Sequence, residues 1–102
     1  MYDVVIQSCM KYKKPPLVWD DWNREHIKKH SVTEAEVEEG YGNEFARSDS
    51  YDKREAIFGT TLSGRMITIV VSYAKQPDPY IVSARTMSAV ERKKYVHKAQ
   101  TN

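Results

Sequence analysis

The strongest structural pattern in the chain is KREAIFGTTLSGRMITIVVSY, residues 53–73. Residues 53–61 alternate between polar and apolar side chains, which indicates a strand with one buried face. Residues 66–73 form a nearly continuous β-branched run, which is typical of a central strand. The four residues between them, LSGR, contain the glycine of a tight turn. The pattern therefore predicts an antiparallel hairpin at the centre of a sheet.

Two further strands are expected on either side of this hairpin. Residues 44–50 form a short possible strand before a polar turn. Residues 80–84 form another strand after the turn KQPDP, residues 75–79. Strands that follow one another through short turns favour antiparallel pairing, so we expect a three- to four-stranded meander.

Helical patterns lie outside the strand region. Residues 20–30 have near-helical spacing and an aspartate cap at Asp20 or Asp21. The sequence TEAE, in which Thr33 precedes Glu36, is a capping box that begins a second helix, which we expect to end at the glycines 40 and 42. A second capping box, Ser88 with Glu91, begins a C-terminal helix. Two N-terminal helices, a sheet and a C-terminal helix make an α+β domain.

Length and composition indicate one small cytoplasmic domain. A chain of 102 residues, 40% hydrophobic and 29% charged, has the composition of a single globular domain. The sequence contains no apolar run of the length that spans a membrane and no signal-peptide pattern, so we expect no membrane association. Cys9 is the single cysteine, which fits a reducing compartment. Residues 1–16, which end at Pro15–Pro16, form an N-terminal extension without an assigned role.

The charges are distributed unevenly, although the net charge is only +2. Residues 11–14 and 85–98 are rich in lysine and arginine, whereas residues 34–44 contain five glutamates and no basic residue. Such clusters are compatible with a solvated surface or with a patch that faces phosphates.

A metal site is disfavoured by the residues around the two histidines of the first helix. His26 and His30 lie four residues apart, so a helix places both on one face. The glutamate of a zinc-protease motif is absent, and Lys28 and Lys29 would repel a dication. We therefore predict no metal and no cofactor, and a surface position for His26. A metal-binding protein that uses both histidines remains a third hypothesis.

Basic and aromatic residues occur at the ends of the predicted strands. Arg54, Arg65, Tyr73 and Arg85 each begin or end a strand, and we expect these ends to converge on one edge of the sheet. Guanidinium groups pair with phosphates and aromatic rings stack on unpaired bases, which favours a nucleic-acid ligand. Solvated or salt-bridged arginines are the alternative. Trp19 and Trp22 are expected in the core.

Three segments together resemble the BrnT family of bacterial type II toxins. These are WDDWNREHIKKHSVTEAEV (19–37), REAIFGTTLSGRMITIVVSY (54–73) and YIVSARTMSAVERKKY (80–95). The matching positions are Trp19–Asp20, Asn23, Lys29 to Val32, Arg54, Gly59, Gly64–Arg65, Ile81 to Arg85, Glu91–Arg92 and Tyr95. The chain departs from the family pattern at the I-S-A-R motif, where Val82 is inserted.

The resemblance implies a RelE-like fold and a ribonuclease that inhibits translation. Its expected partners are RNA and a BrnA-like antitoxin, and operator DNA would be bound only through that antitoxin. Metal-free RNA cleavage requires a base, an acid and cations around the phosphorane, and histidine is the usual group for proton transfer near neutral pH. The resemblance and this chemistry assign catalytic roles to His30, Arg54, Arg65, Tyr73 and Arg85, and RNA-binding roles to Lys29 and Arg92. A non-catalytic, degenerate module that binds nucleic acid or protein is the alternative.

Overall fold

The computed structural model describes residues 14–50 and 52–101, with side chains as far as Val96. Its elements, in chain order, are α2 (Asp21–Lys28), α3 (Glu34–Gly42), β1 (Glu44–Asp49), β2 (Arg54–Thr60), β3 (Met66–Ser72), β4 (Tyr80–Thr86) and α4 (Ala89–Thr101). The strands form one antiparallel sheet in the order β1-β2-β3-β4. The α+β architecture with two N-terminal helices, a meander and a C-terminal helix is confirmed.

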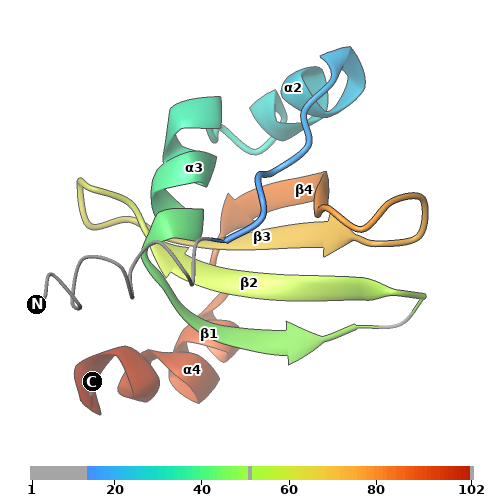
Figure 1. Ribbon diagram of the computed structural model, residues 1–102. Helices are drawn as coiled ribbons and strands as arrows, with labels where there is room; N and C mark the ends of the chain where they lie inside the picture. Colours follow the sequence, from blue (N-terminus) through green and yellow to red (C-terminus); the bar gives the residue numbers. More distant parts are fainter. Residues whose placement is uncertain (1–13, 51, 102) are drawn as a thin grey trace, which may run out of the picture.

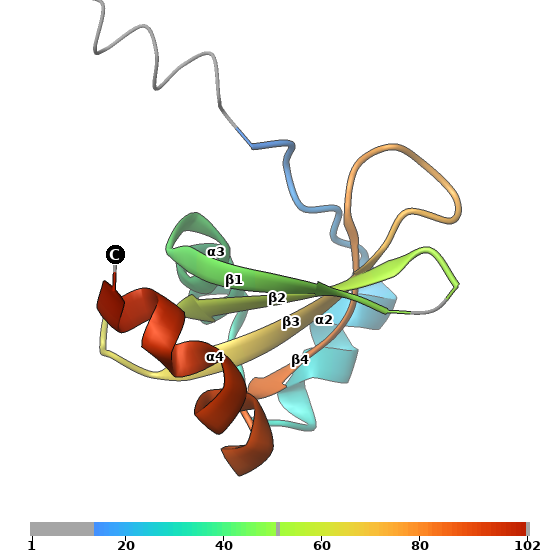
Figure 2. The same ribbon diagram turned by 90° about the horizontal axis from the view of Figure 1, so that it is seen from below.

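The sheet lies between two helical layers (Figure 1). Helices α2 and α3 cover one face, and α4 crosses the other face. Figure 2 shows that α4 lies over the end of the sheet at which β3 begins, away from the β1–β2 and β3–β4 connections. Among the described residues, therefore, no helix lies above the far end of that face.

The main core lies between the sheet and the helices α2 and α3. The strands contribute Ile57, Ile67, Ile69, Val71 and Ile81, each with no exposed surface. These positions alternate along their strands and therefore share one face of the sheet. The helices contribute the equally buried Ile27 and Val37, so the predicted central hairpin carries most of the core.

A smaller core lies on the opposite face, under α4. Phe58 of β2 stacks on Tyr95 of α4, with ring centroids 4.3 Å apart. Ala46 and Met87 complete the buried part of this cluster. Tyr95 therefore packs α4 against the sheet.

Both predicted capping boxes are present, and the predicted aspartate cap of α2 forms a third one. Asp20 caps α2 by accepting from the Asn23 amide at 2.9 Å, and the Asn23 side chain accepts from the Asp20 amide in return. Thr33 and Glu36 cap α3 in the same reciprocal way. Each cap satisfies two backbone amides that the first helical turn leaves without partners.

The predicted end of the second helix is confirmed. Helix α3 continues past Gly40 and ends at Gly42. Gly40 is buried where α3 crosses the sheet, and a Cβ atom on Gly59 would lie only 1.8 Å from the Gly40 carbonyl oxygen. The glycine at position 59 allows the backbones of α3 and β2 to touch, which a side chain there would prevent.

The segment before α2 adds to the edge of the sheet. Val18 forms a parallel bridge with Tyr80, and its amide donates to the Pro79 carbonyl at 2.8 Å. The Tyr41 hydroxyl donates to the Pro15 carbonyl at 2.6 Å, which fixes the end of the N-terminal extension. The rest of that extension, with Cys9, lies outside the described residues. Within residues 14–50 and 52–101, no helix is long and apolar enough to cross a membrane.

Candidate functional site

The strand-end residues do not converge on one edge of the sheet, so that expectation is wrong. Arg54 begins β2 and pairs with Ser72 at the end of β3, next to Tyr73. Arg65 precedes β3, and Arg85 lies near the end of β4, so both belong to the other end. The six residue steps from Met66 to Ser72 separate the two ends by about 20 Å.

The arginines at the second end also lie on opposite faces of the sheet. Arg85 is opposite Thr68 in the register, on the face that α4 covers. The guanidinium group of Arg65 instead contacts Thr86, which is opposite the core residue Ile67. A shift of one residue along a strand changes the face, so Arg85 and Thr86 point to different layers.

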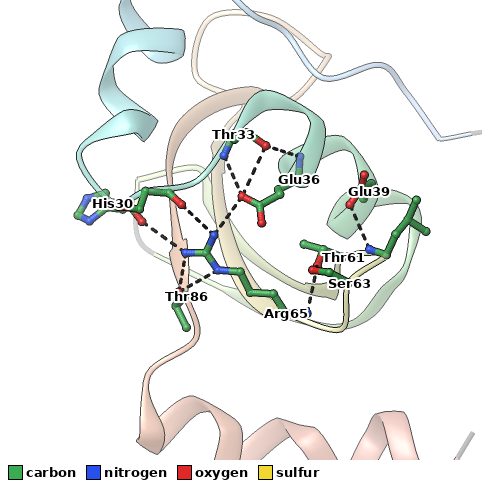
Figure 3. Close-up of polar contacts among 10 residues, drawn as sticks. His30, Thr33, Glu36, Glu39, Thr61, Ser63, Arg65 and Thr86 are labelled. Atoms are coloured by element: carbon green, nitrogen blue, oxygen red, sulfur yellow. Dashed lines mark hydrogen bonds and ion pairs between the residues drawn. The ribbon is translucent and has the colours of Figure 1, made fainter.

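Arg65 joins three separate segments of the chain (Figure 3). Its guanidinium group donates to the Thr86 hydroxyl at 2.8 Å, to the Ser31 carbonyl at 2.8 Å and to the Glu36 carboxylate at 3.0 Å. Ser31 has a φ of 57°, a left-handed conformation that a non-glycine residue adopts at some energetic cost. Arg65 therefore holds a strained turn against the end of the sheet.

His30 contributes its backbone rather than its ring to this cluster. The His30 carbonyl accepts from Arg65 at 3.5 Å, while the imidazole projects away from the guanidinium group (Figure 3). The ring is exposed and makes an edge contact with His26, with centroids 6.3 Å apart. Lys29 ends α2 and is also exposed. RNA would have to approach both side chains from the solvent side of this turn.

Arg85 is paired with a carboxylate of α4. Its guanidinium group donates in parallel to both oxygens of Glu91, at 2.7 and 2.8 Å. Glu91 also accepts from the Thr68 hydroxyl at 2.9 Å and from the Ser88 amide at 3.0 Å. These bonds, the one from Arg85 foremost, lower the pKa of Glu91 to about 2. The pair therefore braces the junction between β4 and α4, which was the structural alternative for Arg85.

A basic hollow of about 530 Å³ opens beside this junction. Its lining consists of Gly64, Arg65, Met66, Thr86, Arg92, Lys93 and Val96. We call this space the basic hollow. Arg92 and Lys93 are exposed on α4 and form no ion pair with the described residues. The lining contains three cations and no carboxylate, which suits a phosphate group.

A second hollow, of about 500 Å³, occupies the opposite end of the sheet, and we call it the Trp22 hollow. It is lined by Val18, Asp20, Trp22, Asp52, Arg54, Ser72, Ala74, Lys75, Gln76, Tyr80 and Val82. Arg54, Ser72 and Tyr80 face it from neighbouring positions on three strands. The side chain of Arg54 makes no hydrogen bond or ion pair within the part of the chain that the structure describes, so the expected salt-bridged alternative does not apply there.

The core position expected for Trp22 is wrong, whereas Trp19 is partly buried against the core. Trp22 is 55% exposed and stacks on His26, with ring centroids 4.6 Å apart and planes 11° apart. The buried positions of α2 are Asn23 and Ile27, so residues 22 and 26 lie beside the buried stripe. The half-exposed surface position of His26 agrees with the prediction.

The polar groups of the Trp22 hollow include a tyrosine–aspartate pair. The Tyr80 hydroxyl donates to Asp20 at 2.7 Å. The amide of Asn23, and secondarily Tyr80, lower the pKa of Asp20, while burial and Asp20 raise the pKa of Tyr80. At neutral pH the pair therefore consists of a carboxylate and a neutral phenol.

Tyr73 lies at the same end of the sheet as Arg54 but packs against the α2–α3 core. Its hydroxyl donates to Glu55 at 2.8 Å, and burial followed by this bond raises the pKa of the phenol. Neither ionisation nor base stacking is favoured for a tyrosine held in this way. The structure therefore does not bring Tyr73 to Arg65 or His30.

Several site residues were missed because their neighbours in space are remote in sequence. Lys93 joins Arg65 only through the packing of α4, and Tyr80 meets Asp20 only because residue 18 bridges to β4. Val82, the insertion in the I-S-A-R motif, is the extra residue of a bulge, because Ser83 pairs with Val70 and Ile81 with Val71. The insertion was the one signal available in the sequence, since bulges often adjoin functional sites.

No group of three or more histidine, cysteine, aspartate or glutamate side chains suited to a metal ion occurs among residues 14–50 and 52–101. Comparisons of the chain with protein-family models, with curated proteins and with solved structures gave no match. The likeness to the BrnT family therefore rests on the motifs quoted above.

Proposed function

We propose that this chain is a cytoplasmic ribonuclease toxin that cleaves RNA without a metal and is neutralised by a BrnA-like antitoxin. The observation that supports this proposal is the contact of Arg65 with both Ser31 and Thr86. It brings together three sequence segments, the K-H-S-V turn, the G-R turn and the end of the S-A-R strand, beside a hollow without carboxylates. These are the segments that carry the resemblance to the toxin family.

The chemistry proposed here divides the work between His30, which does not line the basic hollow, and the cations that line it. The substrate 2′-hydroxyl attacks the adjacent phosphorus, a base removes its proton, and an acid protonates the leaving 5′-oxygen. His30 is the candidate for proton transfer, and RNA reaches its imidazole from solvent. Arg92 and Lys93 attract the phosphate, and Arg65 stabilises the turn on which His30 lies.

A cleavage assay on the purified chain tests this proposal. We expect an unstructured RNA to be cleaved equally well in EDTA, and His30→Ala to reduce the rate by about 100-fold or more. Arg24→Ala serves as the control, because Arg24 pairs with Glu34 on an exposed face and lines neither hollow. Activity that disappears in EDTA and returns with added metal would contradict the metal-free mechanism.

Growth provides the second test. Induced expression without the antitoxin is expected to stop growth, and co-expression of the antitoxin to restore it. Normal growth with the protein confirmed in the soluble fraction would overturn the toxin proposal.

A non-catalytic module that binds nucleic acid or protein is the second candidate function. It is favoured by the pairing of Arg65 with Glu36 and of Arg85 with Glu91, because each carboxylate competes with a phosphate for the same guanidinium group. Tight RNA binding by the purified chain without any cleavage would select this function over the enzyme.

A further inference from the structure

We propose that the Trp22 hollow binds one unpaired nucleobase of single-stranded RNA, which stacks on Trp22 while its phosphate pairs with Arg54. The inference rests on the proposed function in that the ligand is RNA, but it concerns binding and not cleavage. It assigns a second RNA contact at the end of the sheet opposite the basic hollow.

The exposed indole of Trp22 is the first observation. Large aromatic side chains are normally buried, yet more than half of Trp22 is accessible to solvent. His26 stacks on the indole and does not line the Trp22 hollow, whereas Trp22 does. The ring is thus supported by His26 and available to a base, and base stacking on aromatic side chains contributes strongly to single-strand binding.

The unpaired guanidinium group of Arg54 is the second observation. Carboxylates pair with the guanidinium groups of Arg65 and Arg85. The side chain of Arg54 forms no such pair with the described residues. Arg54 is partly buried at the start of β2 and lines the same hollow as Trp22. A partly buried guanidinium group that has no ion pair among the described residues, and that lines the same hollow as an aromatic ring, matches the phosphate and base of one nucleotide.

The charges of the hollow favour a single nucleotide over a long polyanion. Arg54 and the exposed Lys75 are matched in number by Asp20 and Asp52, so the lining has no formal excess of positive charge. Asp20 is already bonded to Tyr80 and to the start of α2. Recognition in this hollow therefore depends on stacking and on one phosphate contact. A base in a duplex is stacked on its neighbours, so only a single strand can supply it.

Binding of a labelled 2′-O-methyl RNA of about eight nucleotides to the full chain tests the inference, since site sizes of about 4–16 nucleotides are usual. The 2′-O-methyl group removes the attacking hydroxyl, so cleavage does not complicate the measurement. We expect Trp22→Ala to weaken binding by about tenfold, because stacking is lost. Arg54→Ala is expected to weaken it by a similar factor.

Two controls separate this site from general effects. Leu62→Ala removes another large apolar side chain that is 80% exposed, at the end of the sheet away from the hollow, and Arg24→Ala removes an equal charge. Both are expected to bind as the parent does. An RNA duplex is expected to bind parent and Trp22→Ala equally. The side chain of Trp22 is exposed, so its truncation leaves no cavity that would unfold the chain.

Tryptophan fluorescence gives an independent readout. The chain contains two tryptophans, so Trp19→Phe leaves Trp22 as the only one. We expect its emission to be quenched on addition of the single strand. Unchanged emission, or an unchanged RNA affinity of Trp22→Ala, would overturn the inference. A Trp22→Ala variant that binds RNA normally and only the antitoxin more weakly would overturn it too. Absence of cleavage with Trp22-dependent binding intact would contradict the enzymatic proposal alone.

Discussion

The carboxylate of Glu91 accepts hydrogen bonds from both terminal nitrogens of Arg85, at 2.7 and 2.8 Å, and so connects the last strand to the last helix. Glu91 also closes the capping box of α4 with Ser88. One carboxylate thus fixes both the start of the helix and its attachment to the sheet. The charge of Glu91 therefore matters for stability.

The stability of the fold is expected to fall with acid through this pair. The pKa of Glu91 is lowered from its ordinary 4.5 to about 2 in the folded chain. The stabilisation is therefore complete above about pH 4.5 and is lost as the pH falls toward about 2. We expect Glu91→Gln to reduce the free energy of unfolding at pH 7 by about 2 kcal/mol, after allowance for solvent screening.

Denaturant unfolding at several pH values measures this effect. The decline of stability below pH 4.5 should be shallower in Glu91→Gln than in the parent. Glu25→Gln is the control, because Glu25 and Lys28 form an exposed pair with little effect on stability. Parallel pH curves for the parent and Glu91→Gln would contradict the prediction.

Asn23 is expected to be the most sensitive polar position of the fold. Its side chain has no exposed surface, caps α2 and donates to the carbonyls of Val18 and Ile81 at 2.9 and 3.2 Å. Asn23→Ala removes the bond from the Asp20 amide, which is half of the capping box, and leaves buried carbonyls unpaired, so we expect a loss of about 3 kcal/mol in thermal or denaturant unfolding. Thr33→Ala, which removes only an exposed cap, should cost about 1 kcal/mol. Equal losses would show that the two carbonyls contribute nothing.

Three glycines provide a graded test of the contact between α3 and the sheet. Gly59→Ala is expected to cost about 3 kcal/mol, since the new Cβ would meet the Gly40 backbone at 1.8 Å. Gly40→Ala should cost about 1 kcal/mol, because the atom it meets, at 2.7 Å, is the end of the Ile67 side chain and can move. Gly42→Ala meets nothing within 4 Å and should stabilise the helix by up to about 1 kcal/mol. Unfolding midpoints in any other order would contradict this description of the contact.

The elements of the fold could be predicted because each has a local pattern. The β-branched run predicted β3. The capping boxes Thr33–Glu36 and Ser88–Glu91, and an aspartate cap at residue 20 or 21, predicted the helix starts. The end of α3 at Gly42 was predicted as well. The packing role of Gly40 was not, because its contact with Gly59 joins residues 19 positions apart.

Predicting which site residues lie together would have required the register of the strands as well as their order. In a meander the start of β2 lies beside the end of β3, so the separation of Arg54 from Arg65 was implicit in the predicted topology. The face on which Arg85 lies was not implicit, because the bulge at Val82 shifts the register of β4. Trp22 is exposed because only Asn23 and Ile27 of α2 are buried. The hydrophobicity of tryptophan led to the prediction of a core position, whereas a polar asparagine occupies the buried face.

The salt dependence of RNA binding is expected to distinguish the two hollows. Arg92 and Lys93 face a lining without carboxylates, so their contacts with phosphates release counterions, each contributing about 0.7 to the slope of log affinity against log salt for a single strand. Arg92→Ala with Lys93→Ala should therefore flatten the slope by about 1.4, measured by fluorescence anisotropy between about 50 and 200 mM salt. Trp22→Ala should weaken binding equally at every salt concentration and leave the slope unchanged, because stacking releases no counterions. An unchanged slope in the double variant would mean that Arg92 and Lys93 do not bind phosphates. A flattened slope in Trp22→Ala would mean that phosphate contacts depend on the Trp22 hollow, which also contradicts the prediction.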